Sequence, residues 1–211
     1  MISPLEIRRY VTAAGRDVVG VWLAGLKDVR TRAKIAARID RLAAGNFSDC
    51  KSLRGGLYEL RIDWGPGYRV YYASVAKACV LLLCGGGQTQ TVVRHQARVG
   101  IFEGLQGTEL MKRKASISHD EATIRELREN PEFAAEYLRA ALEDDDEPVV
   151  LLIALRRIAE ARGGIAKVAK AAGIERESLY RALSLRGNPR LSTLVAVTKA
   201  VGLKLTVEEA R

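Results

Sequence analysis

The stretch "LYELRIDWGPGYRVYYAS", residues 57–74, decides the fold of the first part of the chain. On both sides of "GPG", residues 65–67, the side chains alternate between two sets, as they do along a β-strand. Pro66 fixes its own φ and the flanking glycines accept unusual backbone dihedrals, so the tripeptide is a turn. The stretch therefore predicts an antiparallel β-hairpin.

Helices are expected before this hairpin and a further strand after it. Apolar residues recur at spacings of three and four over residues 17–44, where Gly25 divides the pattern into two helices or into a helix and its continuation. After the hairpin, "ACVLLLCGG", residues 78–86, is apolar on both faces, as a central strand should be. The predicted fold class is α+β, with two helices and an antiparallel sheet followed by an all-α second part.

Charge divides the 211 residues into three segments. Residues 1–110 hold 16 Lys and Arg against 9 Asp and Glu, residues 111–150 hold 6 against 11, and residues 151–211 hold 12 against 5. The net charges are therefore +7, −5 and +7. Two basic parts separated by an acidic segment favour two polyanion-binding units, although charge also varies by chance along any protein chain.

Several classes of site are not expected. The three cysteines lack metal-ligand spacing, and two histidines are too few for the usual zinc or triad sites. The N-terminus does not resemble a signal peptide, and no window approaches the roughly 20 apolar residues of a membrane span. We expect a cytoplasmic protein with reduced thiols and no cofactor, no metal and no membrane partner.

Arg61 and Arg69 lie on either side of the same predicted turn, on the strand face opposite the predicted core. One interpretation is a solvated strand face, where arginine is common, and the pattern alone slightly favours it. The other is a phosphate-binding surface that Lys51 and Arg54 from the preceding loop would join.

Residues 5–86 resemble the RelE/HigB toxin superfamily in its phage Gp49-like, addiction-module killer branch, chiefly through "GLYELRIDWGPGYRVYY" and the strand "LLLCGG". The resemblance implies a small α/β fold and metal-independent, ribosome-dependent cleavage of messenger RNA. In that reaction the RNA 2′-hydroxyl attacks the adjacent phosphate, so the protein positions the RNA and stabilises charge. The residues that it implies as catalytic are Lys51, Arg54, Arg61, Arg69 and Tyr71, with Tyr68 as an alternative to Tyr71.

The second part begins near Met111 and is expected to be helical. Ser118 and Glu121 have capping-box spacing, and Asn130 and Pro131 suit the cap and first residue of a further helix. The acidic run at residues 143–147 favours a helix that starts near residues 146–148, because negative charge stabilises a helix N-terminus.

The strongest local motif is "IAKVAKAAGIERESLYRALS", residues 165–184. Counted from Ile165, a small residue stands at position five, glycine at nine, and apolar residues at four, eight, ten, fifteen and eighteen. This spacing is typical of a DNA-binding helix-turn-helix, since the small residue lets the helices approach and the glycine permits a left-handed turn. An ordinary helical hairpin is the alternative, which the agreement of all seven positions makes the weaker interpretation.

Residues 112–208 also resemble HigA-type addiction module antidote antitoxins of the XRE/Cro-C1 class, in which "GNPRLSTL" is a recurring signature. The resemblance implies operator DNA as a partner, autorepression of transcription and a homodimer. On the outer face of the predicted recognition helix and in the loop after it, the residues expected to contact bases or phosphates are Arg176, Ser178, Tyr180, Arg181, Asn188 and Arg190.

The stretch between the two resemblances fits neither family. A single-base deletion near residues 85–87 is compatible with a basic, helix-forming tail of the toxin type, ending in a stop that overlaps the codon for Met111. We therefore expect residues 87–110 to be a linker whose reading frame is altered. The predicted organisation is a toxin domain at 1–86, this linker, an acidic toxin-contacting segment at 111–147 and a DNA-binding domain at 148–211.

Two functional hypotheses follow. In the first, the chain is a fused toxin–antitoxin whose mRNA interferase, with ribosome and mRNA as partners, is neutralised by toxin–antitoxin contacts within or between chains. In the second, the chain is a DNA-binding transcription repressor with a catalytically dead toxin domain. Whether the first part is an enzyme is left open, because the altered linker replaces a segment that the toxin family uses.

Overall fold

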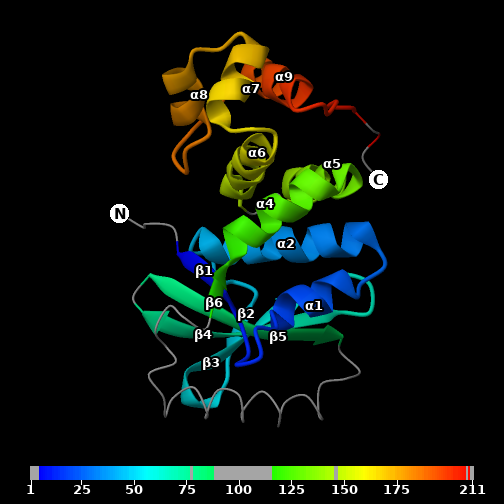
Figure 1. Cartoon of the computed structure of the whole chain (residues 1–211), viewed down its shortest axis with the longest axis vertical. Coiled ribbons are helices and arrows are strands. Elements are labelled where there is room, and N and C mark those ends of the chain that lie inside the picture. Colours follow the sequence, from blue (N-terminus) through cyan, green and yellow to red (C-terminus); the bar gives the residue numbers. More distant parts are fainter. Residues whose placement is uncertain (1–4, 77, 88–115, 145–146, 208, 210–211) are drawn as a thin grey trace. The chain divides into compact units, whose positions relative to one another are not determined.

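The computed structural model describes residues 5–76, 78–87, 116–144, 147–207 and 209. The chain divides into two compact units, residues 1–123 and residues 124–211. Its fold class is α+β, with a mixed sheet in unit 1 and helices in unit 2 (Figure 1). The expected linker at residues 87–110 lies outside the described residues, apart from Gly87, and so does the expected start at Met111.

Unit 1 is a sheet with two helices on one of its faces (Figure 1). The strand order is β2-β3-β4-β5-β1-β6. The helices are α1 (Val18–Ala24) and α2 (Val29–Ala43). The strands are β1 (Glu6–Tyr10), β2 (Cys50–Ser52), β3 (Leu57–Ile62), β4 (Tyr68–Ala76), β5 (Cys79–Gly87) and β6 (Ser116–Ser118), and a short 3₁₀ turn covers Arg54–Gly56.

The predicted hairpin and helices are confirmed. Strands β3 and β4 pair antiparallel across a turn in which Gly65 and Gly67 have positive φ. The two helices are separated at Gly25, which caps the C-terminal end of α1. Each begins after an aspartate whose side chain accepts backbone N–H bonds, Asp17 for α1 and Asp28 for α2.

The sheet is mixed, and the expectation of an antiparallel sheet was wrong. Strand β1 pairs parallel with β5, in a register that places Ile7 opposite Val80. It pairs antiparallel with β6 on its other side. The periodicity of the sequence did not indicate β1, β2 or β6, because these strands are short and β1 carries two consecutive arginines, Arg8 and Arg9.

Both faces of the sheet carry a core, so the face of Arg61 and Arg69 is only partly solvated. The larger core lies between the sheet and α1 and α2, and includes Ile35, Ile39 and Leu82. The smaller core lies on the other face. Its buried residues are Leu57, Tyr71, Ala73, Leu81 and Leu83.

Gly85 explains part of the glycine-rich end of β5. A Cβ placed on this residue would collide with the Trp22 ring of α1. The glycine therefore lets α1 lie directly on the strand, which gives the "LLLCGG" segment a packing role.

The regular elements described in unit 2, and the one that leads into it, are all helices joined by loops (Figure 1). Helix α4 (His119–Glu129) contributes residues to both units. The remaining helices are α5 (Pro131–Leu142), α6 (Val149–Ala161), α7 (Ile165–Ala172), α8 (Arg176–Ala182) and α9 (Leu191–Ala200).

The predicted helix starts in this region are confirmed. The Asn130 side chain accepts the backbone N–H of Phe133 at 3.0 Å, and Pro131 is the first residue of α5. Helix α6 begins at Val149, directly after the predicted residues 146–148. The buried Tyr137 of α5 stacks on Phe133 and accepts a hydrogen bond from Arg157 of α6 at 2.8 Å, which fixes the two helices together.

Candidate nucleic-acid interfaces

A cross-strand cluster on the second sheet face brings together four of the five predicted catalytic residues. Arg61 and Arg69 are directly opposite each other on β3 and β4. In the neighbouring row, Lys51 on β2 faces Glu59 on β3, which in turn faces Tyr71 on β4. Residues paired in this way share one face of a sheet, so these side chains form a single basic face around Glu59.

Glu59 is the centre of that cluster, and sequence reasoning missed it. Its Oε1 accepts a hydrogen bond from Arg61 Nε at 3.0 Å, and its Oε2 accepts one from the Tyr71 hydroxyl at 2.6 Å. Arg69 Nε lies 3.8 Å from Oε1. The signal was present in the sequence, since Glu59 stands two positions before Arg61 and must share its face.

The charges around Glu59 decide its protonation. Burial acts to raise the pKa of this carboxyl, but hydrogen bonds from Tyr71 and Arg61 and the charges of Arg61 and Arg69 outweigh it, so the pKa is lowered from its ordinary value. Glu59 is therefore an anion at neutral pH, and it neutralises part of the positive charge that the two arginines bring.

The two arginines differ in exposure. The Arg61 side chain is 44% exposed, and the Arg69 side chain is 14% exposed. Arg69 also donates from Nη1 to the Tyr68 carbonyl at 2.8 Å, and the same nitrogen lies 3.9 Å from a carboxylate oxygen of Asp63. Arg61 is thus the more accessible of the pair, while Arg69 is held along its strand.

The remaining candidates of unit 1 are placed differently. Lys51 is exposed on β2, the strand at one edge of the sheet. Tyr71 is fully buried, whereas Tyr68 lies on the opposite, helix-covered face beside Trp22. The backbone of Arg54 lies in the 3₁₀ turn after β2, and its side chain is outside the described part of the structure.

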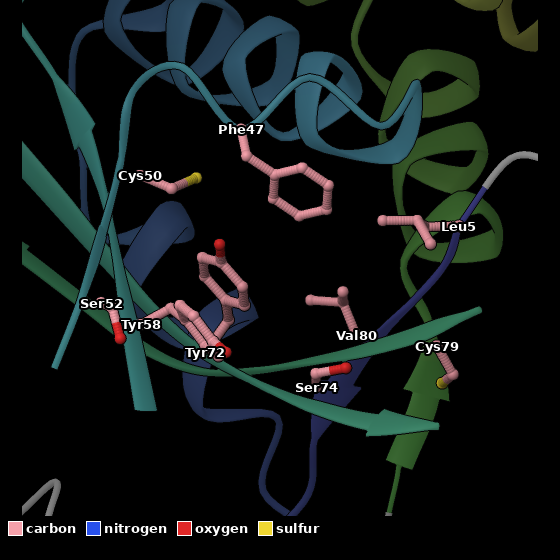
Figure 2. Close-up of a pocket in the computed structure, with 9 residues that line it drawn as sticks. All are labelled: Leu5, Phe47, Cys50, Ser52, Tyr58, Tyr72, Ser74, Cys79 and Val80. Carbon is pink, nitrogen blue, oxygen red and sulfur yellow. The ribbon is translucent and has the colours of Figure 1, made fainter. Parts of the chain in front are cut away.

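A cavity of about 390 Å³ lies on the helix-covered side of unit 1, away from the basic face. Figure 2 shows the nine residues that line it, among them Phe47, Cys50, Tyr58 of β3 and Tyr72 of β4. The Tyr58 and Tyr72 rings stack with centroids 5.2 Å apart. Burial raises the pKa of Tyr72 and also that of the Cys50 thiol, so neither group is poised as a nucleophile at neutral pH.

In unit 2, α7 and α8 form a helix pair joined by a tight turn. Gly173 ends α7 with φ 67° and ψ 29°, the left-handed conformation that the sequence predicted for this position. The apolar residues of the motif face inward, and Val168, Ala169 and Leu179 are at most 2% exposed. The pair is therefore a packed unit, and α7 contacts both α8 and α9.

The polar residues of α8 face solvent. Arg176 and Arg181 are exposed, as is Tyr180 at 51%. Ser178 is half-buried and donates from its hydroxyl to Glu175 at 2.8 Å, so in this state it helps to fix the start of the helix. These four predicted DNA-binding residues thus lie on one short helix, three of them exposed.

Arg156 of α6 holds Tyr180 in place, and sequence reasoning did not identify it. Its guanidinium carbon lies 5.0 Å from the centre of the Tyr180 ring, and its Nη2 donates to the Tyr180 hydroxyl at 3.3 Å. A cation stacked on an aromatic ring restricts both side chains, and it leaves further positive charge beside α8.

The loop between α8 and α9 extends the same basic surface. Asn188 and Arg190, both predicted to contact phosphates, are exposed, and so is Arg186. Gly187 has no room for a side chain, because a Cβ there would collide with the Ala182 carbonyl at the end of α8. That close approach keeps the loop against the helix.

Within the described ranges, no group of three or more His, Cys, Asp or Glu side chains could hold a metal ion. No helix in the same ranges has the length and apolar run that crossing a bilayer requires.

Comparisons with known proteins point to one family. A family model described as "Probable addiction module antidote protein" matches residues 119–209. Two proteins of Haemophilus influenzae (strain ATCC 51907 / DSM 11121 / KW20 / Rd), each named only as an uncharacterized protein, are similar to parts of the chain. One is 54% identical over 68 residues, which are 32% of this chain and 69% of the relative. The other is 43% identical over 75 residues, 36% of this chain and 75% of the relative.

Proposed function

The chain belongs to the family described as probable addiction module antidote proteins, and from this premise we propose that it is a toxin–antitoxin fusion. Membership of an antidote family implies a toxin partner. In the proposal, that partner is part of the same chain, as a RelE/HigB-like toxin domain at residues 1–86. The second part is a HigA-like antitoxin that neutralises this unit and represses its own operator.

The observation that carries the DNA-binding half of the proposal is the geometry of α7 and α8. A left-handed glycine joins two packed helices, and the second helix presents Arg176, Tyr180 and Arg181 to solvent. A recognition helix enters the major groove with such a face, where arginine contacts guanine or phosphate. In the proposal, the exposed Arg190 and Asn188 hold the DNA backbone beside it.

The basic face of unit 1 supports the toxin half of the proposal. A ribonuclease without a metal needs cations that position the scissile phosphate and stabilise the charge that develops on it. Arg61, Arg69 and Lys51 supply three cations on one sheet face. In the proposed reaction the P–O2′ bond forms as the P–O5′ bond breaks, and the proton lost by the 2′-hydroxyl is balanced by the one that the leaving 5′-oxygen gains. The protein supplies charge and orientation.

A second candidate function is a DNA-binding repressor whose toxin unit is inactive. It is favoured by the state of the basic face, where Glu59 pairs with Arg61 and Arg69 and the hydroxyl of the buried Tyr71 is bonded to Glu59. A phosphate would have to compete with that carboxylate. The two functions differ only in whether unit 1 cleaves RNA, so one pair of assays separates them.

The first assay is a gel shift with the full chain and the DNA upstream of its own coding sequence, titrated with salt. Replacing Arg176 and Arg181 together with alanine should weaken binding and lower the salt slope by about 0.9 for each lost phosphate contact. The matched control is Arg125→Ala with Arg128→Ala, which removes two exposed arginines from α4. Equal loss in both double variants would contradict the assignment of α8.

The second assay follows mRNA cleavage on translating ribosomes by residues 1–110 alone, by the full chain, and by residues 1–110 with Arg61→Lys, which keeps the charge but loses the planar fork. Under the fusion hypothesis, residues 1–110 cleave mRNA, the full chain cleaves less because its second part neutralises them, and Arg61→Lys lowers cleavage by residues 1–110 at least about tenfold. No cleavage by residues 1–110, with operator binding by the full chain intact, would favour the repressor.

A further inference from the structure

The sheet of unit 1 is completed by a strand that comes from far along the chain. Strand β6 pairs antiparallel with β1, with Arg9 opposite Ile117 and Tyr10 opposite Ser116. Among the described strands, β6 occupies the edge of the sheet and β1 lies between it and β5. Removing β6 would therefore leave β1 as an edge with backbone groups open to another strand.

Arg8 ties the two strands together beyond the backbone ladder. Its Nε donates to the Ser116 hydroxyl at 2.6 Å, and its Nη2 donates to the Ser116 carbonyl at 2.8 Å. Two bonds from one guanidinium to one residue fix the register of a three-residue strand, which the short ladder alone would specify weakly.

A buried polar contact follows directly after the strand. Arg9, which is 5% exposed, donates from Nε to Nδ1 of His119, which is 0% exposed, at 2.9 Å. The Thr123 hydroxyl donates to the His119 carbonyl at 2.9 Å and so holds the first turn of α4. Because Nδ1 accepts this bond, it carries no proton.

The same arginine reaches the helix layer of unit 1. Its Nη1 lies 3.4 Å from Asp17 Oδ2, and the other oxygen of Asp17 accepts the Gly20 N–H at 2.8 Å as the cap of α1. Arg9 therefore links the start of α1 to His119. A buried arginine is costly without such partners, so the sheet has a strong preference for a segment that brings an acceptor to this point.

We propose that residues 116–123, which lead into the antidote-family region and include its first residues, are its toxin-docking element and bind the toxin-like sheet by adding a strand to β1. The family match begins at residue 119, so the Arg9–His119 bond joins the antidote region to the sheet. Arg8 donates hydrogen bonds to the carbonyl and hydroxyl of Ser116, and Arg9 donates one to the imidazole of His119, three residues later. The inference rests on the proposed function, which identifies the sheet as a toxin and the region after it as an antidote. It predicts that a separate antidote chain of this family docks on β1 in trans.

The test cuts the folded chain into an N-terminal and a C-terminal piece. A protease recognition sequence replaces residues 97–103 of the full chain, the folded protein is cleaved, and the N-terminal piece is immobilised through a terminal tag. Release of the C-terminal piece is then followed over time. We expect the wild-type pieces to stay together and His119→Leu to accelerate release at least about tenfold, since it removes the acceptor of the Arg9 Nε–H.

Two variants separate docking from a general loss of structure. His119→Asn places an amide oxygen where Nδ1 stands, and its release should stay within about threefold of wild type. Arg125→Ala on the exposed side of α4 should release like wild type. Near-UV circular dichroism of the immobilised N-terminal piece, with Trp22 and Trp64 as reporters, should be retained after the partner leaves.

Three results would overturn the inference. They are equal release rates for His119→Leu and wild type, immediate separation of the wild-type pieces, and loss of the near-UV signal when the C-terminal piece leaves. No RNA or DNA enters this experiment. A failure of ribosomal cleavage or of operator binding would thus count against the proposed function and leave the release rates as they are.

Discussion

At the scale of single residues, Glu59 determines how much of the positive charge of the basic face is neutralised. It is the acceptor that Arg61 and Tyr71 share, and it lies within 3.8 Å of Arg69. An arginine pair on adjacent strands repels itself, and a carboxylate between them relieves that repulsion. The same carboxylate opposes the approach of a phosphate, so under the proposed function one side chain links the stability of the sheet to RNA binding.

Glu59→Gln should destabilise unit 1 at neutral pH by about 1.5–3 kcal/mol, the usual value of hydrogen bonds to a charged group. Because the pKa of Glu59 is lowered in the folded protein, its contribution is present above the unfolded-state value, about 4.3, and is lost as the pH falls through the folded-state value. The difference between the variant and wild type should therefore shrink below about pH 4. Urea unfolding across the pH range measures it.

Asp63→Asn is the matched control, because this carboxylate is 91% exposed and lies 3.9 Å from the nearest Arg69 nitrogen. It should leave the free energy of unfolding almost unchanged at every pH. A Glu59→Gln effect that stayed constant down to pH 3 would mean that the loss comes from packing and not from charge.

Gly173 shows how one element depends on one backbone conformation. Its φ of 67° puts it in the left-handed region, and no atom lies within 4 Å of the position that a Cβ would take. Gly173→Ala should thus lower the free energy of unfolding of the helical unit by about 1 kcal/mol through backbone strain alone. Gly173→Asn should cost less, since asparagine tolerates this conformation.

Guanidine unfolding of both Gly173 variants, followed by circular dichroism at 222 nm, gives the comparison. Equal losses for alanine and asparagine would show that strain at φ is not the cause. Operator affinity should follow stability in this pair, because neither substitution removes a group from the exposed face of α8.

At the scale of helices and strands, the sequence predicted the elements that have a strong hydrophobic periodicity or a capping signal. The two helices of unit 1, the hairpin and the cap of α5 all have local signals, and each is present. Strands β1, β2 and β6 have five, three and three residues, and their pairing is decided by partners up to about a hundred residues away. No local pattern carries that information, so the mixed sheet could not be predicted.

The candidate site was predictable to a similar extent. Alternation placed Arg61 and Arg69 on one face, because strand geometry alone fixes this relation. How deeply the side chains on that face are buried was not predictable, since the second core around Tyr71 depends on tertiary packing. Neither the Arg156–Tyr180 contact nor the Arg9–His119 bond has a sequence signal, because each joins elements that only the fold brings together.

At the scale of the whole molecule, the net charge of +7 on residues 151–211 and the short helix α8, taken with the proposed DNA binding, lead to a prediction about stoichiometry. One such helix reads only a few base pairs, so tight operator binding requires two copies on an inverted repeat with half-sites about 34 Å apart. Native mass spectrometry of the complex should give two chains per DNA duplex. A complex with one chain per duplex, at the same affinity, would contradict it.

The parallel pairing of β1 with β5 also constrains how the chain is made. Strand β1 leaves the ribosome first, yet its first neighbour is about seventy residues later and its second, β6, about a hundred residues later. Closing such long loops is slow, and a nascent chain grows by about 5–20 residues per second. For several seconds of synthesis the sheet therefore exists without its last strand, and it is completed only when the beginning of the antidote region has emerged. Translation itself thus imposes an order in which strands β1 to β5 can pair before β6 arrives.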